Sequence, residues 1–160
     1  MYFHCVIKYG LIFGGFSSNS GKIFILQKEI IRIMAGGQPR TSCGRLFKQL
    51  EILPVQCQYM LLLMNFIISN KEIFETNSSV HNINTRNKYH LHRLNAKLPC
   101  FQKGIFSAGT KIFKSMKILK HEKVKFKASL RKYLCTHSSY SVDEFLCVKM
   151  MYNTAFVKCL

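Results

Sequence analysis

The chain has 160 residues, enough for one domain that buries a core. Hydrophobic residues make up 48% of it, which excludes an intrinsically disordered protein. Its 24 Lys and Arg residues face seven acidic residues, so the net charge is +17. A field this positive attracts nucleic acid or an anionic membrane surface, and it carries no information about the fold.

The cysteines and the N-terminal segment bear on the cellular compartment. The seven cysteines are odd in number and widely spaced and include no C-x-x-C pair, so neither a zinc knuckle nor a thioredoxin-type pair is indicated. The opening apolar segment is interrupted by His4 and Lys8 and is followed by no small-residue cleavage site. We therefore expect reduced, largely buried thiols in an intracellular protein of the nucleus or cytoplasm that is not secreted.

Apolar spacing predicts two helices in the first third of the chain. The first runs from about Ser20, as N-cap, to Ala35 and is stopped by Gly36 and Gly37. The second runs from about Ser42 to Leu50. The apolar face expected for the first helix is Ile23, Leu26, Ile30, Ile33 and Met34.

The third predicted helix, about Pro54 to Ser69, contains the most apolar run of the sequence, Cys57 to Ser69. At about 13 residues this run is short of the ~20 needed to span a bilayer. A polar stripe of Gln58, Asn65 and Ser69 accompanies apolar residues at helical spacing, which is typical of a nearly buried core helix.

The second half of the chain is expected to hold a long loop and two more helices. Asn70 to Pro99 has no helical period and is predicted to be an extended loop or irregular hairpin. A fourth helix follows from about Phe101 to Lys117, weakened by Gly104 and Gly109, and a fifth from about His121 to Leu134. A short turn of helix is expected near Ser141 to Cys147.

These elements define a mainly α fold: a small bundle of four to five helices with a long basic loop between the third and the fourth. The helical module is expected to cover residues 20–147. A truncated N-terminal segment, 1–19, precedes it, and an unstructured tail, 148–160, follows it.

Positive charge is concentrated in the loop and on the fifth helix. Thr76 to His121 holds nine Lys or Arg residues and no acid. On the fifth helix Lys123, Lys127 and Arg131 stack at i, i+4 and i+8, where like charges repel. A solvated surface would tolerate this pattern, and a site for a polyanion would require it. Both interpretations stay open at this level.

The sequence lacks the residues of most catalytic sites. Asp143 is the one aspartate, and with Glu144 it is expected to mark a helix start. The pairs His90/His92 and Cys135/His137 have no further ligands at suitable spacing. No phosphate-binding, dinucleotide-binding or nucleophile-elbow motif occurs. We expect no enzyme activity, no bound metal and no cofactor.

Four motifs in order carry a resemblance to a known family. They are LQK-x-I-I-R at Leu26 to Arg32, NTR at Asn84 to Arg86, FQK at Phe101 to Lys103 and HS-x-YSVDEF at His137 to Phe145. From about Lys8 to Lys149 the chain resembles the segment that follows the polymerase domain in Jockey-like non-LTR retrotransposon reverse transcriptases of arthropods. The resemblance implies a helical thumb and C-terminal extension, with the catalytic aspartates of the parent lying upstream.

Departures from the family pattern suggest a degenerate, truncated remnant. A Trp, two prolines and a Tyr that are usual in the family are missing at Gly14–Gly15, Leu94, Met116–Lys117 and Ser107. Met1 would then be a chance start, and residues from Met150 on show no family character. The missing palm domain would be a packing partner, which could leave Leu46, Phe47 and Leu50 uncovered.

The leading hypothesis is thus a non-catalytic remnant with sequence-independent affinity for RNA or single-stranded DNA, and no small-molecule substrate. Tyr89 could stack on bases, whereas Phe101 is interpreted mainly as a core anchor of the fourth helix. The alternatives are a cationic membrane-surface protein that uses Cys57 to Ser69, and an open reading frame without selected function. The candidate nucleic-acid-binding residues are Arg86, Lys88, His90, His92, Arg93, Lys103, Lys123, Lys127 and Arg131.

Overall fold

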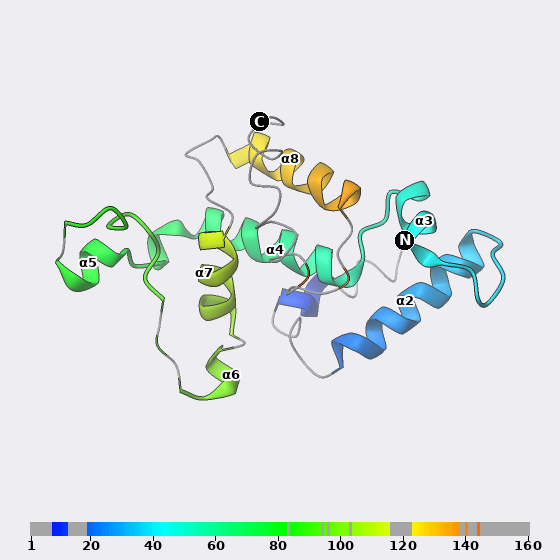
Figure 1. The fold of residues 1–160 in the computed structure, drawn as a ribbon, viewed down its shortest axis with the longest axis horizontal. Coiled ribbons are helices and arrows are strands. Elements are labelled where there is room, and N and C mark those ends of the chain that lie inside the picture. The colour runs from blue at the N-terminus through cyan, green and yellow to red at the C-terminus, as the bar shows by residue number, and fades with distance from the viewer. Residues whose placement is uncertain are drawn as a thin grey trace.

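The computed structural model describes residues 8–12, 19–82, 84–93, 95, 97–102, 104–115, 123–137, 140 and 144. Its regular structure is helical (Figure 1), which confirms the predicted mainly α fold. A helical turn covers 8–12. The named elements of the described part are α2 (Ser20–Met34), α3 (Cys43–Gln49), α4 (Val55–Ser69), the 3-10 helix η1 (Lys71–Ile73), α5 (Asn77–His81), α6 (Pro99–Gln102), α7 (Ile105–Ser115) and α8 (Lys123–Thr136).

Helix α4 is the centre of the bundle, as predicted for a nearly buried helix. It packs against α2, α7 and α8 (Figure 1), and Leu63, Met64 and Ile67 have no exposed surface. The same core takes in Leu11 from the helical turn at 8–12. Of the predicted polar stripe, Ser69 is exposed and Asn65 half-buried, but Gln58 is buried. Neighbours thus surround the first half of α4 more completely than its sequence predicts.

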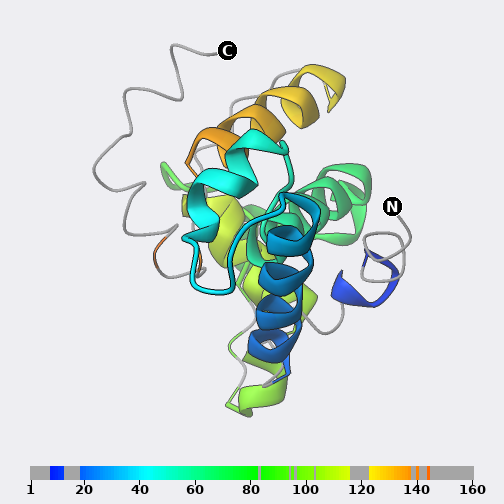
Figure 2. The same cartoon turned by 90° about the vertical axis from the view of Figure 1, so that its right-hand side faces the viewer.

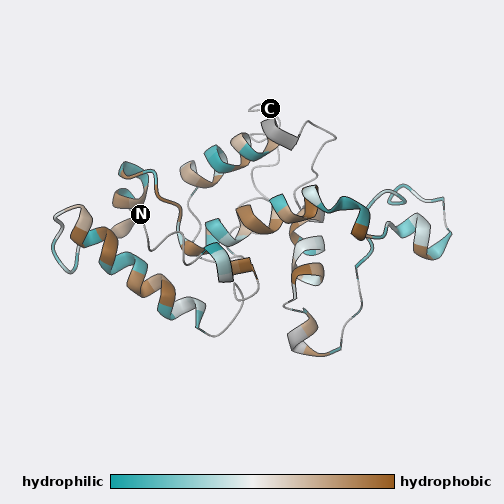
Figure 3. Cartoon of the chain, turned by 180° about the vertical axis from the view of Figure 1, so that it is seen from behind, coloured by the Kyte–Doolittle hydropathy of each residue, from teal (hydrophilic) through white to brown (hydrophobic). Residues whose placement is uncertain are grey.

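Helix α2 has the predicted length, but it is rotated relative to the predicted apolar face. Its buried residues are Phe24, Gln27 and Ile31. Leu26 and Ile33, which were expected to face the core, are 52% and 79% exposed. Apolar residues occupy much of the circumference of α2, as the brown segments in Figure 3 show, so hydrophobic spacing alone does not determine which side turns inward.

Backbone geometry ends α2 and α3 in the same way. Gly36 adopts φ +62°, and the N–H groups of Gly36 and Gly37 donate to the carbonyls of Ile33 and Arg32. This is the Schellman motif that the two glycines predict. After α3 the left-handed position is taken by Glu51, at φ 51°. The N-cap of α2 is Asn19 rather than the predicted Ser20, and its side chain makes no cap hydrogen bond.

A small second cluster lies between α2 and α3. Phe24 and Phe47 stack with ring centroids 6.2 Å apart, and Tyr140 packs on Phe24 at 5.4 Å. Phe47 is therefore buried, contrary to the expectation that a missing partner would leave it uncovered. Leu46 and Leu50 are half-buried against the same cluster. Tyr140 belongs to the HS-x-YSVDEF string, so this residue of the string has a packing role.

Three of the seven cysteines have described side chains. Cys43 and Cys57 are buried, Cys135 is half-buried, and all three are free thiols. These three fit the prediction of reduced, largely buried thiols. Tyr140 precedes the turn of helix predicted near Ser141, where only Glu144 is described, and its N–H donates to the Glu144 carboxylate at 2.7 Å.

The predicted fourth helix is divided in two. Gly104 separates α6 from α7, so the prediction of one continuous helix from Phe101 is wrong. Phe101 is 65% exposed and does not anchor the core. Gly109 has a packing role instead: a Cβ at this position would lie 2.7 Å from Cδ1 of Ile67. The absence of a side chain at Gly109 lets α7 approach α4 closely.

Helix α8 turns an apolar stripe toward the core. Phe126, Leu130 and Leu134 are buried against α4, while Tyr133 is half-buried. The helix also contacts α3, which lies next to it in Figure 2. The predicted tail, 148–160, lies outside the described residues.

Candidate nucleic-acid interface

The basic loop between α4 and α6 folds back on itself as an irregular hairpin, the second of the two forms predicted for it. Thr76 and Leu91 form an antiparallel bridge, and His92 N–H donates to the Glu75 carbonyl at 2.7 Å. Two elements within the loop, η1 and α5, were missed because three and five residues are too few to show a helical period. We refer to residues 76–93 as the basic hairpin.

A capping box starts the short helix α5. The Thr76 hydroxyl accepts from the N–H of Ser79, and the Ser79 hydroxyl accepts from the N–H of Thr76. The next two N–H groups, of Asn77 and Ser78, donate to the carbonyls of His90 and Lys88. These bonds tie the helix to the returning segment of the hairpin. Asn82, at φ 50°, ends α5 in the left-handed conformation that asparagine tolerates.

An apolar side chain anchors the returning segment of the hairpin. Leu91 is 7% exposed and belongs to the main core cluster. His90 and His92 are half-buried, and the His92 ring meets the His81 ring edge-on at 4.9 Å.

The charged residues of the hairpin differ in their exposure to solvent and in their contacts. Arg86 and Arg93 are exposed. Lys88 is half-buried, its ammonium donates to Asn84 Oδ1 at 2.8 Å, and it lies 4.9 Å from the centroid of the Tyr89 ring. Tyr89 is 73% exposed, so one face of its ring remains open for stacking.

A second basic surface lies on α8. Lys127 and Arg131 are both exposed, one turn apart. The side chain of Lys123 and the whole of Lys103 lie outside the described residues. In Figure 1 the hairpin extends from one end of α4 while α8 lies along α4, so the structure places the predicted residues on two surfaces.

The described residues offer little for the alternative functions. No helix of the described part is long and apolar enough to cross a membrane. The Cys57 to Ser69 run cannot present its apolar side to a bilayer in this fold, because Leu63 and Ile67 are fully buried. Nowhere in the described ranges do three or more His, Cys, Asp or Glu residues lie together as metal ligands would.

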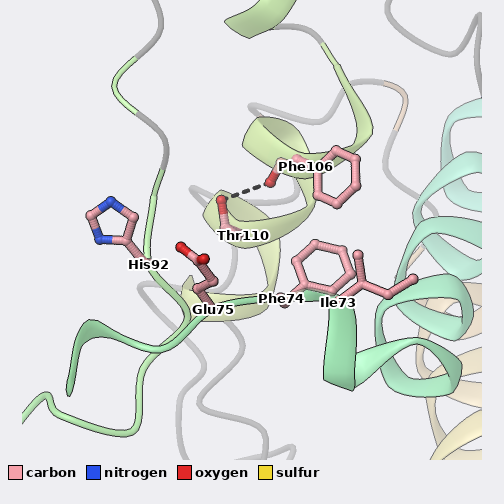
Figure 4. Close-up of a pocket in the computed structure, with 6 residues that line it drawn as sticks. All are labelled: Ile73, Phe74, Glu75, His92, Phe106 and Thr110. Carbon is pink, nitrogen blue, oxygen red and sulfur yellow. Dashed lines mark hydrogen bonds between the residues drawn. The ribbon is translucent and has the colours of Figure 1, made fainter. Parts of the chain in front are cut away.

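Comparison of the chain with family models, with curated proteins and with solved structures finds no match. The resemblance to retrotransposon reverse transcriptases therefore stays a prediction from the sequence motifs. The structure adds one site that the sequence did not indicate, a pocket between η1, the base of the hairpin and α7 (Figure 4). Its residues come from three separate segments, so no local pattern in the sequence could have revealed it.

Proposed function

We propose that the chain is a non-catalytic helical module that binds single-stranded RNA or DNA by contacting the sugar-phosphate backbone of the nucleic acid. The observation that carries this proposal is the basic hairpin, which holds Arg86 and Arg93 outward on a folded support. Phosphates need charge and N–H donors but no particular sequence, and exposed arginines supply both. Tyr89 adds an aromatic face of the kind on which unpaired bases stack.

The acid-free composition of this region supports the same proposal. Thr76 to His121 has nine basic residues and no acid, so no carboxylate within the segment competes with phosphate for them. Lys127 and Arg131 extend the positive field along α8. A solvated surface would not need such an excess, because the self-repulsion of a +17 chain opposes compact folding.

The resemblance gives this proposal a background. In a remnant of a reverse transcriptase, the module would have held template and primer next to a palm domain. Helix α2 offers a surface for such a partner: Leu26, Ile33 and Met34 are 52%, 79% and 60% exposed. The sequence suggested that residues of α3 would contact this partner, but these exposed apolar residues of the structure lie on α2.

The test is a salt titration of binding to a labelled single strand of about 12 nucleotides, which is within the usual site sizes. The logarithm of the association constant should fall linearly with the logarithm of salt concentration. Replacing Arg86, Lys88 and Arg93 with Ala should reduce the slope by about 0.7 for each phosphate that the variant no longer neutralises. K127A/R131A should reduce it independently.

The matched control is K22A/R40A, which removes two exposed cations from α2 and from the turn that follows it, outside the basic hairpin and α8. It lowers the net charge by the same amount as K127A/R131A and should leave the slope nearly unchanged. Affinity that does not depend on salt, or no binding at low salt, would contradict the proposal. An equal effect of all the variants would show that net charge acts without a site.

A further inference from the structure

The pocket beside the basic hairpin has two unlike sides. Its volume is about 320 Å³, within the range of small-molecule sites. In Figure 4 Ile73, Phe74 and Phe106 stand on one side, and Glu75, His92 and Thr110 on the other.

The apolar side ends in an accessible ring. Phe74 is 7% exposed and lines the pocket, and its ring centroid lies 5.1 Å from that of Phe106. Phe106 is 43% exposed, so part of its ring is accessible to a ligand beside Phe74. A flat aromatic ligand could stack there, as bases do on the aromatic side chains of single-strand-binding proteins.

The polar side offers acceptors. Glu75 is exposed and brings a carboxylate, one of only seven acids in the chain. The Thr110 hydroxyl gives its proton to the carbonyls of Phe106 and Ser107, at 2.9 and 3.0 Å. Its remaining lone pairs can only accept hydrogen bonds. A ligand group that contacts Glu75 and Thr110 must therefore donate, whereas the His92 imidazole offers one donor and one acceptor.

The position of the pocket ties it to the hairpin. Glu75 and His92 are joined through their backbones, and the next residues in the chain are Thr76 and Arg93. A strand whose phosphates contact Arg93 would thus pass close to the pocket. The Glu75 carboxylate repels phosphate itself, and the +17 field of the chain repels a cationic ligand.

We propose that the pocket takes an unpaired nucleobase with an exocyclic amino group, stacked on Phe106 and donating to Glu75. A base is neutral, flat and carried into the site by a polyanion, so it satisfies each condition above. Cytosine presents its N4 amino group to a carboxylate. Uracil presents carbonyl oxygens on both sides of its one N–H, and these would be repelled. This inference rests on the proposed function and adds a base preference to it.

The experiment compares oligocytidine with oligouridine of about 12 nucleotides, at one salt concentration, by fluorescence anisotropy. Oligocytidine should bind roughly fivefold or more tightly. Glu75→Gln should bring the ratio of the two affinities close to one. Glu72→Gln, at an exposed carboxylate of η1 outside the pocket lining, removes the same charge and should preserve the ratio.

A second variant tests stacking. Phe106→Ala should weaken binding of oligocytidine more than of oligouridine, and circular dichroism checks that the fold is retained. Equal affinity of the wild-type chain for both oligonucleotides, or a ratio that Glu75→Gln leaves unchanged, overturns the base pocket while the proposed function stands. Failure to bind either oligonucleotide at low salt overturns both.

Discussion

The side-chain amide of Gln27 donates to the backbone carbonyl of Leu53 at 2.9 Å. The same amide accepts from the N–H of Val55, also at 2.9 Å, and Gln27 is 1% exposed. One buried side chain thus satisfies a donor and an acceptor on either side of Pro54, where the chain enters α4. Without the Gln27 amide, the Leu53 carbonyl and the Val55 N–H would lose these hydrogen bonds next to an apolar core.

The first prediction follows from this clamp. Gln27→Leu should lower the free energy of unfolding by about 2–4 kcal/mol, because it leaves the Leu53 carbonyl and the Val55 N–H without partners. Urea denaturation followed by circular dichroism measures the change. Gln49→Ala, at an exposed position of α3, should change stability by less than about 0.5 kcal/mol. Equal losses in the two variants would show that the amide does not act as a clamp.

The rotation of α2 can be tested with two isoleucines that lie two positions apart. Ile31 is 1% exposed and Ile33 is 79% exposed. Ile31→Ala should cost about 2–4 kcal/mol of stability through lost burial and a cavity. Ile33→Ala should cost less than about 0.5 kcal/mol. A larger loss from Ile33→Ala would mean that α2 turns its other side to the core.

Glycine at position 109 should resist replacement in spite of helix propensity. Alanine is better than glycine in a helix by about 1 kcal/mol, so propensity alone favours Gly109→Ala. The added methyl group would lie 2.7 Å from Cδ1 and 3.3 Å from Cγ1 of Ile67, so this fully buried side chain must shift within the core, and we expect a net loss of about 1–2 kcal/mol.

The control for this substitution is Gly21→Ala in α2, where nothing lies within 4 Å of the new Cβ. That change should raise the melting temperature slightly, whereas Gly109→Ala should lower it. Stabilisation by both would show that α7 can move away from α4 at no cost.

The stability of the fold should fall at high pH because of a buried tyrosine. Burial raises the pKa of the Tyr59 hydroxyl from 10.0 to about 12. Between these values the unfolded chain has lost the proton and the folded chain keeps it, so rising pH favours unfolding. The loss across this window should reach about 2–3 kcal/mol.

Urea denaturation at about pH 9 and again near pH 12 measures this loss. Tyr59→Phe should make the fall in stability shallower. Tyr89→Phe, at a side chain that is 73% exposed, should leave it unchanged. Part of the fall will persist in Tyr59→Phe, because burial also raises the pKa of Tyr133 and Tyr140.

The ends of the long helices could be predicted from the sequence because local chemistry determines them. Gly36 and Gly37 stop α2, and Pro54 sets the start of α4 through its backbone angles, with φ near −54° and ψ near 151°. These signals act within a few residues, so they can be recognised in the sequence without knowledge of the rest of the fold.

Local signals could not predict which side of α2 is turned to the core, nor the structure of the basic hairpin. Both depend on groups far apart in the chain. Gln27 finds its partners 26 and 28 residues away, and Thr76 finds Leu91 across the hairpin. In α2 the polar Gln27 is buried while the apolar Ile33 is exposed, which inverts the rule that a periodicity argument applies.

Leu91 gives the hairpin a thermodynamic link to the rest of the molecule. It lies in the main core cluster, and Lys88 and Arg93 stand three positions before it and two positions after it in the chain. The hairpin cannot detach without taking Leu91 into water, so its ordering is part of folding and not part of binding. The amides of Asn77, Ser78 and His92, which donate to carbonyls across the hairpin, should therefore exchange with solvent about as slowly as those of α4, and denaturant should abolish binding and folding at the same midpoint.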